Sequence, residues 1–352
     1  MKRGILRVIG INLMCVSLLF LSAFCDFSPK KSFSYNIKGE TGENVNTEPA
    51  NNEEKNENSS PEKVQEEEKE NESKTECSEK TTTQVSASAI KGNIISQYNS
   101  PYTAKDSFDG VYLKNNTSLN ISIKKYLQGN INFKIAKNDQ PQVLILHTHA
   151  TETFKNDDNP YYTEDFTSRS RDNAVNMISV GKIVSDKLNA AGITTLHDTT
   201  LHDYPSYSKS YSRSAETVKS YLKKYPSIKV VLDLHRDAVT KENGDKVKLV
   251  TEINDKTAAQ VMLVQGSQSG GITNFPNWEE NFKLAVKLQQ VMEKKYPTLA
   301  RPLMLMSKNY NQSLSTGALL IEFGTDANTL SEVHYSAELV GDSLAELLSS
   351  LQ

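Results

Sequence analysis

Residues 141–152 read PQVLILHTHATE, and this stretch decides the fold. A continuous apolar run from Val143 to Leu146 follows a proline and predicts a strand that is buried on both faces. IKVVLDL at residues 228–234 and ALLIEFG at residues 318–324 have the same character. Because these runs are too short for helices, the sequence predicts that they are the central strands of one sheet.

Helical periodicity separates these strands. Met177, Val180 and Val184 recur at spacings of three and four residues and predict a helix over residues 173–191, which Gly192 ends. Further helices are expected at 212–224, 278–295 and 331–351, with additional strands at 193–196, 246–254 and 258–266. The alternation of strands and helices predicts an α/β domain with a mostly parallel central sheet flanked by helices.

The amino-terminal end has the pattern of a membrane-targeting segment. Lys2 and Arg3 precede an apolar run over residues 8–24. Such a run suits a signal peptide or a short transmembrane helix, and either one places the rest of the chain outside the cytoplasm. Because bulky Phe24 stands where a cleavage site needs a small residue, we expect an uncleaved transmembrane signal-anchor and cytoplasmic stub at residues 1–25, with cleavage as the alternative.

An acidic, polar tract follows at residues 26–105. It is dominated by Glu, Lys, Asn, Ser and Thr and has few apolar side chains to bury, so it cannot offset the entropy of ordering. We expect a disordered linker that tethers a catalytic domain at residues 106–352.

Composition narrows the chemistry of that domain. The net charge of −3 and the lack of a basic patch speak against a nucleic-acid partner. Cys15, Cys25 and Cys77 all precede the domain, so it has no thiolate or internal disulfide. Any catalysis must come from histidines, carboxylates, hydroxyls or a bound metal.

Histidines and a carboxylate lie where the central strands end. His147 and His149 follow the first strand, His235 follows the second, and Glu322 is near the end of the third. Ligands of open α/β sheets bind beyond the carboxyl ends of the strands, so these side chains should meet at one rim. Imidazole and carboxylate are the usual non-thiol ligands of zinc. The sequence therefore predicts a zinc site, with Glu322 moving the proton and burial raising its pKa.

Several assignments at this rim stay open. Alternation places His147 and His149 on the same side of an extended strand, so either could be the first ligand. Asp172 is the best third ligand, or it only caps the helix that follows. Arg236 binds a substrate carboxylate or oxyanion through its planar fork of donors, or it pairs with Asp237.

Four motifs in order carry a family resemblance: PQVLILHTHATETF, LDLHRDA, FPNWEENFKLAVKL with YPTLARPL, and ALLIEFGTDANT. From about Gly110 onward the chain resembles the stage II sporulation protein P family, membrane-anchored peptidoglycan hydrolases of endospore-forming bacteria. That family is similar in turn to zinc N-acetylmuramoyl-L-alanine amidases of the amidase-3 type, whose phosphorylase/hydrolase-like fold is the one the resemblance implies. Carried over by position, the amidase ligands and the catalytic glutamate fall on His149, Asp172, His235 and Glu322.

The chain departs from the amidase pattern at two places. The amidases have Gly before the first histidine, whereas this chain reads HTH at residues 147–149, which leaves His147 as an alternative ligand. Asp172 replaces a glutamate whose side chain is one methylene longer, so either the backbone lies closer to the metal here or this ligand is lost.

The resemblance implies Zn2+-dependent cleavage of the N-acetylmuramoyl-L-alanine amide during engulfment of the forespore, with endopeptidase activity on cross-bridges. It implies peptidoglycan as substrate, and stage II sporulation protein D (a lytic transglycosylase) and a membrane scaffold protein as partners. The protein would be a single-pass membrane protein with its catalytic domain in the space between mother cell and forespore. The alternatives are a zinc endopeptidase or carboxypeptidase acting only on stem peptides, and a non-catalytic wall-binding scaffold.

Overall fold

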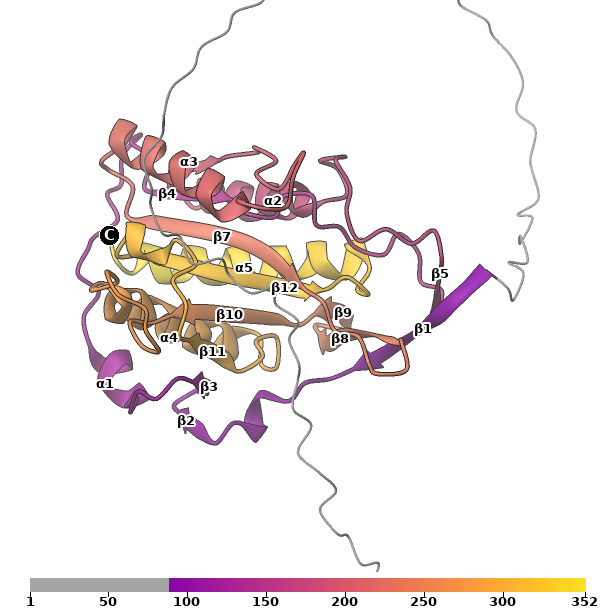
Figure 1. Cartoon of the computed structure of the whole chain (residues 1–352). Helices are drawn as coiled ribbons and strands as arrows, with labels where there is room; N and C mark the ends of the chain where they lie inside the picture. Colours follow the sequence, from indigo (N-terminus) through magenta and orange to yellow (C-terminus); the bar gives the residue numbers. More distant parts are fainter. Residues whose placement is uncertain (1–88) are drawn as a thin grey trace, which may run out of the picture. The chain divides into compact units, whose positions relative to one another are not determined.

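An eight-stranded sheet forms the centre of residues 89–352, the part of the chain that the computed structural model describes (Figure 1). In spatial order its strands are β2 (Asp106–Phe108), β3 (Val111–Asn116), β11 (Leu303–Met306), β10 (Val261–Gly266), β12 (Ala318–Thr325), β7 (Val230–Asp237), β4 (Val143–Leu146) and β6 (Thr195–His197). The expected signal-anchor and most of the expected linker lie outside the described residues. None of the described helices is both long and apolar enough to span a bilayer.

The sheet is mixed, and the expectation of a mostly parallel sheet was wrong. Strands β12, β7, β4 and β6 run parallel to one another. Strand β10 is antiparallel to β12, and β11 and β3 follow the direction of β10. The reason is that no crossover helix joins β7 to β10, so the chain re-enters the sheet from the rim where β7 ended. That rim therefore combines the carboxyl ends of β4, β7 and β12 with the amino ends of β10 and β11.

Helices cover the two faces of the sheet unequally. Helices α2 (Met177–Ala190), α4 (Trp278–Lys295) and α5 (Leu330–Ser349) bury apolar side chains such as Val184, Leu288 and Val340 in the main core on one face. The short α1 (Ile123–Gln128) adds to this core. On the opposite face, α3 (Ser210–Lys224) packs Val218 against Leu144 and Leu146. The rest of that second face is left to loops, which makes room for a site.

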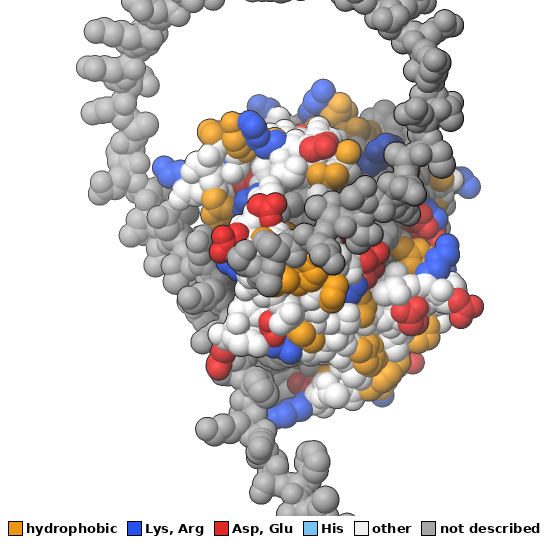
Figure 2. Space-filling model, turned by 90° about the vertical axis from the view of Figure 1, so that its right-hand side faces the viewer, with side chains coloured by type: hydrophobic (Ala, Val, Ile, Leu, Met, Phe, Trp, Pro, Cys, Tyr) orange, Lys and Arg blue, Asp and Glu red, His pale blue; other side chains and the backbone are white. Residues whose placement is uncertain are grey.

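A smaller four-stranded sheet extends from the rim (Figure 1). Its order is β5 (Tyr161–Thr163), β1 (Ile90–Gln97), β8 (Lys246–Ile253) and β9 (Lys256–Ala259). Strand β1 lies within the span expected to be linker, so ordered structure begins earlier than residue 106. Figure 2 looks onto this side of the molecule, where acidic and basic side chains are interspersed with hydrophobic ones.

Most expected elements form, with shifted ends. The bounds of β4 and α4 match the sequence pattern, whereas the helix expected from residue 173 begins at Met177. It begins there because the side chain of Asn176 accepts a hydrogen bond from the Ile178 amide and caps the helix. The single strand expected over 258–266 is divided at Gln260 into β9 and β10.

Candidate active site

The alternation of β7 lines up three polar side chains on the loop-covered face. Asp233, His235 and Asp237 occupy every second position of that strand, on the face of the buried Val231. Glu322 of β12 is the direct neighbour of His235 in the parallel register, so both side chains point to the same face. The sheet itself thus places an imidazole beside a carboxylate at the rim.

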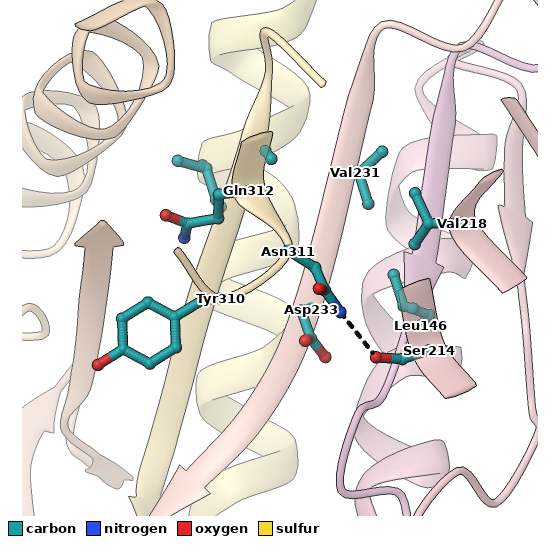
Figure 3. Close-up of a pocket in the computed structure, with 10 residues that line it drawn as sticks. Leu146, Ser214, Val218, Val231, Asp233, Tyr310, Asn311 and Gln312 are labelled. Carbon is teal, nitrogen blue, oxygen red and sulfur yellow. Dashed lines mark hydrogen bonds between the residues drawn. The ribbon is translucent and has the colours of Figure 1, made fainter. Parts of the chain in front are cut away.

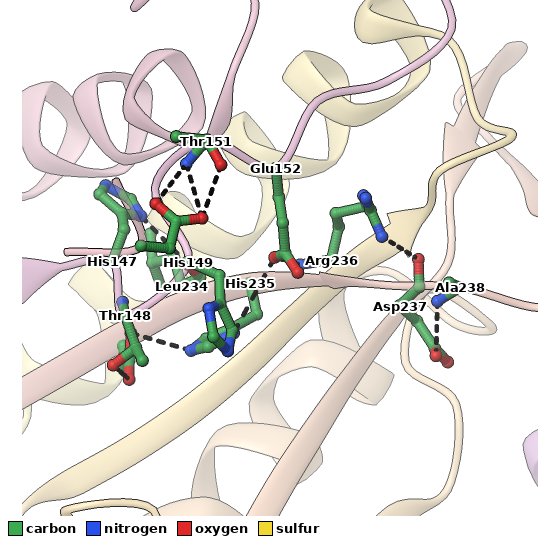
Figure 4. A network of polar contacts seen from close by, with 12 residues as sticks. His147, Thr148, His149, Thr151, Glu152, Leu234, His235, Arg236, Asp237 and Ala238 are labelled. Atoms are coloured by element: carbon green, nitrogen blue, oxygen red, sulfur yellow. Dashed lines mark hydrogen bonds and ion pairs between the residues drawn. The ribbon is translucent and has the colours of Figure 1, made fainter. Parts of the chain in front are cut away.

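A turn after β4 brings a second imidazole and a second carboxylate to this place. The amide of Glu152 donates to the carbonyl of His149 at 3.1 Å, which closes the turn. Glu152 Oε2 then lies 3.9 Å from His235 Nδ1 and accepts from the Arg236 amide at 3.2 Å (Figure 4). The rings of His149 and His235 meet edge to face, with centroids 5.3 Å apart.

Each imidazole is oriented through one nitrogen. His149 Nε2 is 3.2 Å from the hydroxyl of Tyr207, whose ring stacks on it at 4.5 Å between centroids, while His149 Nδ1 is buried and has no hydrogen-bond partner among the described residues. His235 Nε2 is 2.9 Å from Asp233 Oδ1, an ion-pair distance, although the angle is not that of a hydrogen bond. Thr148 holds Asp233 with its amide at 2.8 Å and its hydroxyl at 2.6 Å.

The electrostatics of the cluster favour a cation. Burial, and to a smaller extent the charge of His235, lowers the pKa of His149 to about 3. This ring is therefore neutral, and one of its nitrogens has a lone pair that can bind a metal ion. Burial alone would lower the pKa of His235, but Asp233, Glu322 and Glu152 together raise it well above its usual range. Burial also raises the pKa of Glu322, against the opposing charge of His235. Carboxylates that hold a proton on a buried imidazole create the negative potential that a metal ion requires.

Side-chain chemistry at this rim fits zinc. Two imidazoles with second-nitrogen partners and nearby carboxylates form a typical donor set. The buried His149 Nδ1 and Glu322 Oε2 atoms lack hydrogen-bond partners among residues 89–352. Buried polar atoms are usually hydrogen-bonded, so their state is consistent with a role in binding a ligand. Within the same residues, no group of three or more His, Cys, Asp or Glu side chains is drawn together closely enough, as it stands, to hold a metal ion.

A sequence model of the family described as stage II sporulation protein P matches residues 25–345. The chain belongs to this family. It is 31% identical over 226 residues to stage II sporulation protein P of Bacillus subtilis (strain 168), an alignment that covers 59% of this chain and 51% of that protein. The chain therefore spans about half the length of that relative.

The fold is weakly similar to solved amidases. One is the CwlD amidase from Clostridioides difficile in complex with the GerS lipoprotein, with 10% identity, a TM-score of 0.39, and 59% of this chain and 99% of that chain covered. Another is an N-acetylmuramoyl-L-alanine amidase from Clostridium difficile 630, with 16% identity, a TM-score of 0.35, and coverage of 60% and 95%.

His147, one of two expected first ligands, faces away from the cluster in this family member. Its Nε2 contacts His197 Nε2 at 2.9 Å, and its Nδ1 contacts the carbonyl of Leu234 at 3.1 Å. Both nitrogens are therefore engaged on the α2 side of the sheet, beneath Gly181. The side chains of His147 and His149 lie on different sides of the sheet because β4 ends at Leu146 and the chain turns before His149. The alternation of a strand therefore does not apply to these two residues.

Asp172 and Arg236 also have other partners. Asp172 is exposed, and its carboxylate accepts from the amide of Ala174 at 2.9 Å in a local turn. The guanidinium of Arg236 donates to three backbone carbonyls, at 2.8–3.3 Å, those of Thr153, Ser168 and Asp237. The structure thus brings His149, His235 and Glu322 together and does not bring these two side chains to them.

Sequence reasoning missed Glu152, Asp233 and Arg301. The spacing H-x-x-E at residues 149–152 could have indicated Glu152, since three residues span one turn of chain. Asp233 could have been found two residues before His235 on the same strand face. Arg301 lies in the stretch YPTLARPL that carries part of the resemblance, but that stretch does not indicate a site, because only the fold brings Arg301 to Asp237, where Nη1 and Oδ2 are 2.9 Å apart.

A small cavity borders the cluster on the same face (Figure 3). Asp233, Ser214 and Asn311 line it, and Asn311 donates to the Ser214 hydroxyl at 3.1 Å. Its volume of about 10 Å³ is no more than a water molecule needs, so it is not a substrate pocket.

Proposed function

We propose that this chain is a zinc-dependent peptidoglycan hydrolase that cleaves the amide between the muramoyl lactyl group and L-alanine. The observation that carries the proposal is the meeting of His149, His235, Glu152 and Glu322 at one rim, where His149 Nδ1 and Glu322 Oε2 have no hydrogen-bond partner among residues 89–352. A scaffold module would have no reason to bury such a set, because unpaired buried polar groups are destabilising.

The residues proposed to hold the metal are His149, His235 and Glu152. Glu152 takes the place that the resemblance gave to Asp172, because it lies 3.9 Å from His235 whereas Asp172 is exposed. The contacts to Tyr207 and Asp233 fix the orientation of the two rings, as outer partners of metal-binding histidines do. The chemistry that zinc supplies when bound is polarisation of a carbonyl and activation of water near neutral pH.

Glu322 is proposed as the general base and acid. Its partly buried carboxylate accepts a proton from the attacking water and returns it to the leaving amine nitrogen, and its raised pKa brings it toward the working range for both steps. Position supports this role, since Glu322 is beside His235 in the sheet and its Oε2 has no hydrogen-bond partner among the described residues.

The wider setting is proposed from family membership. It comprises endopeptidase activity on cross-bridges, engulfment of the forespore, single-pass anchoring with the domain outside the cytoplasm, and cooperation with stage II sporulation protein D and a membrane scaffold.

The test is digestion of purified cell-wall sacculi by the full chain. We expect new amino-terminal alanine to appear, to vanish with a zinc chelator and to return when zinc is restored. Glu322→Gln should abolish the product, while the exposed Asp172→Asn should not. Cleavage only within the stem peptides would instead support the endopeptidase alternative, and no cleavage at all would support the scaffold.

A further inference from the structure

Arg301 lies at the active-site rim and is not used by the mechanism above. It precedes β11, at the rim where β7 and β12 end, and it is 4% exposed. Its Nη1 donates to Asp237 Oδ2 at 2.9 Å, and its charge is close enough to oppose the rise in the pKa of Glu322. Arg301 therefore belongs to the neighbourhood of the proposed general base.

Two donor nitrogens of Arg301 take no part in a hydrogen bond within residues 89–352. Nε and Nη2 of Arg301 are both buried and find no acceptor among the residues that the structure describes. These two atoms form one edge of the guanidinium, from which two parallel N–H bonds can reach the two oxygens of a carboxylate. Burying charged donors without an acceptor is costly, so a free edge of this kind calls for a ligand.

The neighbouring arginine provides the contrast. Arg236 is similarly buried and also reaches Asp237, but its Nε, Nη1 and Nη2 all donate to backbone carbonyls. Each of its three guanidinium nitrogens therefore has an acceptor in the backbone around the site. The free edge is thus particular to Arg301 and does not follow from burial of an arginine at this rim.

We infer that Arg301 binds a carboxylate on the peptide side of the scissile amide, an inference that rests on the proposed function. The lactyl carboxyl of the muramoyl side is consumed in the amide, so free carboxylates of the substrate belong to the stem peptide. Glu322 delivers its proton to the leaving amine, so the peptide continues on the side of Glu322. Strand β10 lies on that side of Glu322. There the apolar Met262 is the direct neighbour of Glu322 and can contact the methyl group of the alanine.

The test compares two peptides that contain no scissile amide. The dipeptide L-Ala-D-Glu and its diamide differ only in the carboxylates, and calorimetry measures their binding to the full chain. We expect the wild type to bind the dipeptide at least about tenfold more tightly, as two charge-assisted hydrogen bonds permit. Equal binding of the two peptides would overturn the inference.

Two variants locate the effect. Arg301→Lys keeps the charge but has no fork, so its preference should fall below about threefold. Arg236→Lys, the matched control, should keep the preference. A preference that survives in Arg301→Lys would overturn the assignment.

Nuclear magnetic resonance tests the same contact in the wild-type protein, so the result does not depend on whether a variant folds. One arginine Nε–H resonance of the wild type should move on addition of the dipeptide and stay in place with the diamide; no movement would contradict the inference. Because neither binding nor resonance shift requires turnover, these results stand even if digestion of sacculi disproves the hydrolase.

Discussion

Glu152 Oε2 lies 3.9 Å from His235 Nδ1, although the two residues come from different parts of the chain. The turn after β4 supplies the carboxylate, and the end of β7 supplies the imidazole. Two atoms that bind the same metal ion can lie this far apart. This relationship is the reason to place Glu152, and not Asp172, in the proposed metal site.

Replacing Glu152 should therefore remove both metal and activity. In Glu152→Gln we expect both zinc affinity and activity to fall. Each should fall by more than the roughly 10–100-fold that follows from loss of a residue that only supports a metal ligand. Zinc per chain after gel filtration, together with the rate of amide cleavage, measures the effect. Asp172→Asn is the control and should retain zinc, and a reversed result would restore the assignment based on resemblance.

Asp233 should act through His235. Asp233→Asn keeps the shape but removes the charge that orients the ring, so zinc affinity should fall by about 10–100-fold. Competition with a chelator of known affinity measures this change. Unchanged affinity would mean that the 2.9 Å contact with His235 has no role in the site.

The His147–His197 pair should make the protein sensitive to acid. Burial lowers the pKa of His147 to about 3 and that of His197 to about 4, below the value of about 6.5 in the unfolded chain. The unfolded state therefore binds more protons than the folded one below pH 6.5. Stability from these two rings is complete above about pH 6.5 and is lost as pH falls, by up to about 1.4 kcal/mol per pH unit for each ring.

Urea denaturation of the wild type and His197→Gln between pH 7 and 5 checks this linkage. The variant should be less stable at pH 7 and should lose less stability on acidification. Parallel pH profiles would show that His197 does not titrate in this way.

Gly181 should not tolerate a methyl group. An alanine Cβ there would lie 2.5 Å from Nε2 of both His147 and His197. Alanine favours a helix over glycine by about 1 kcal/mol, but overpacking against two rings usually costs about 1–3 kcal/mol. We expect Gly181→Ala to be destabilised in thermal unfolding, while Lys182→Ala on the exposed side of α2 stays within about 0.5 kcal/mol of the wild type. A more stable Gly181→Ala protein would contradict the packing of this pair.

The sequence predicted the central strands and the long helices because their apolar patterns are local. It could not predict the direction of β10, which depends on the chain staying at one rim through β8 and β9. The residues of the candidate site divide in the same way into those that the local sequence predicted and those that only the fold places. His235 and Glu322 were found from strand ends, whereas the separation of His147 from His149 depends on where β4 stops. Arg301 lies within the quoted stretch YPTLARPL, but it reaches the site only through tertiary structure, so its position there could not be predicted from the local sequence.

His149, Glu152 and His235 are proposed to hold one zinc ion beside Glu322. Anomalous scattering at the zinc edge, measured from crystals of the protein grown with zinc, tests this metal site. We expect a single strong peak within bonding distance of His149 Nδ1, Glu152 and His235. A peak at His147 and His197, a peak at Asp172, or no peak in this cluster would contradict it.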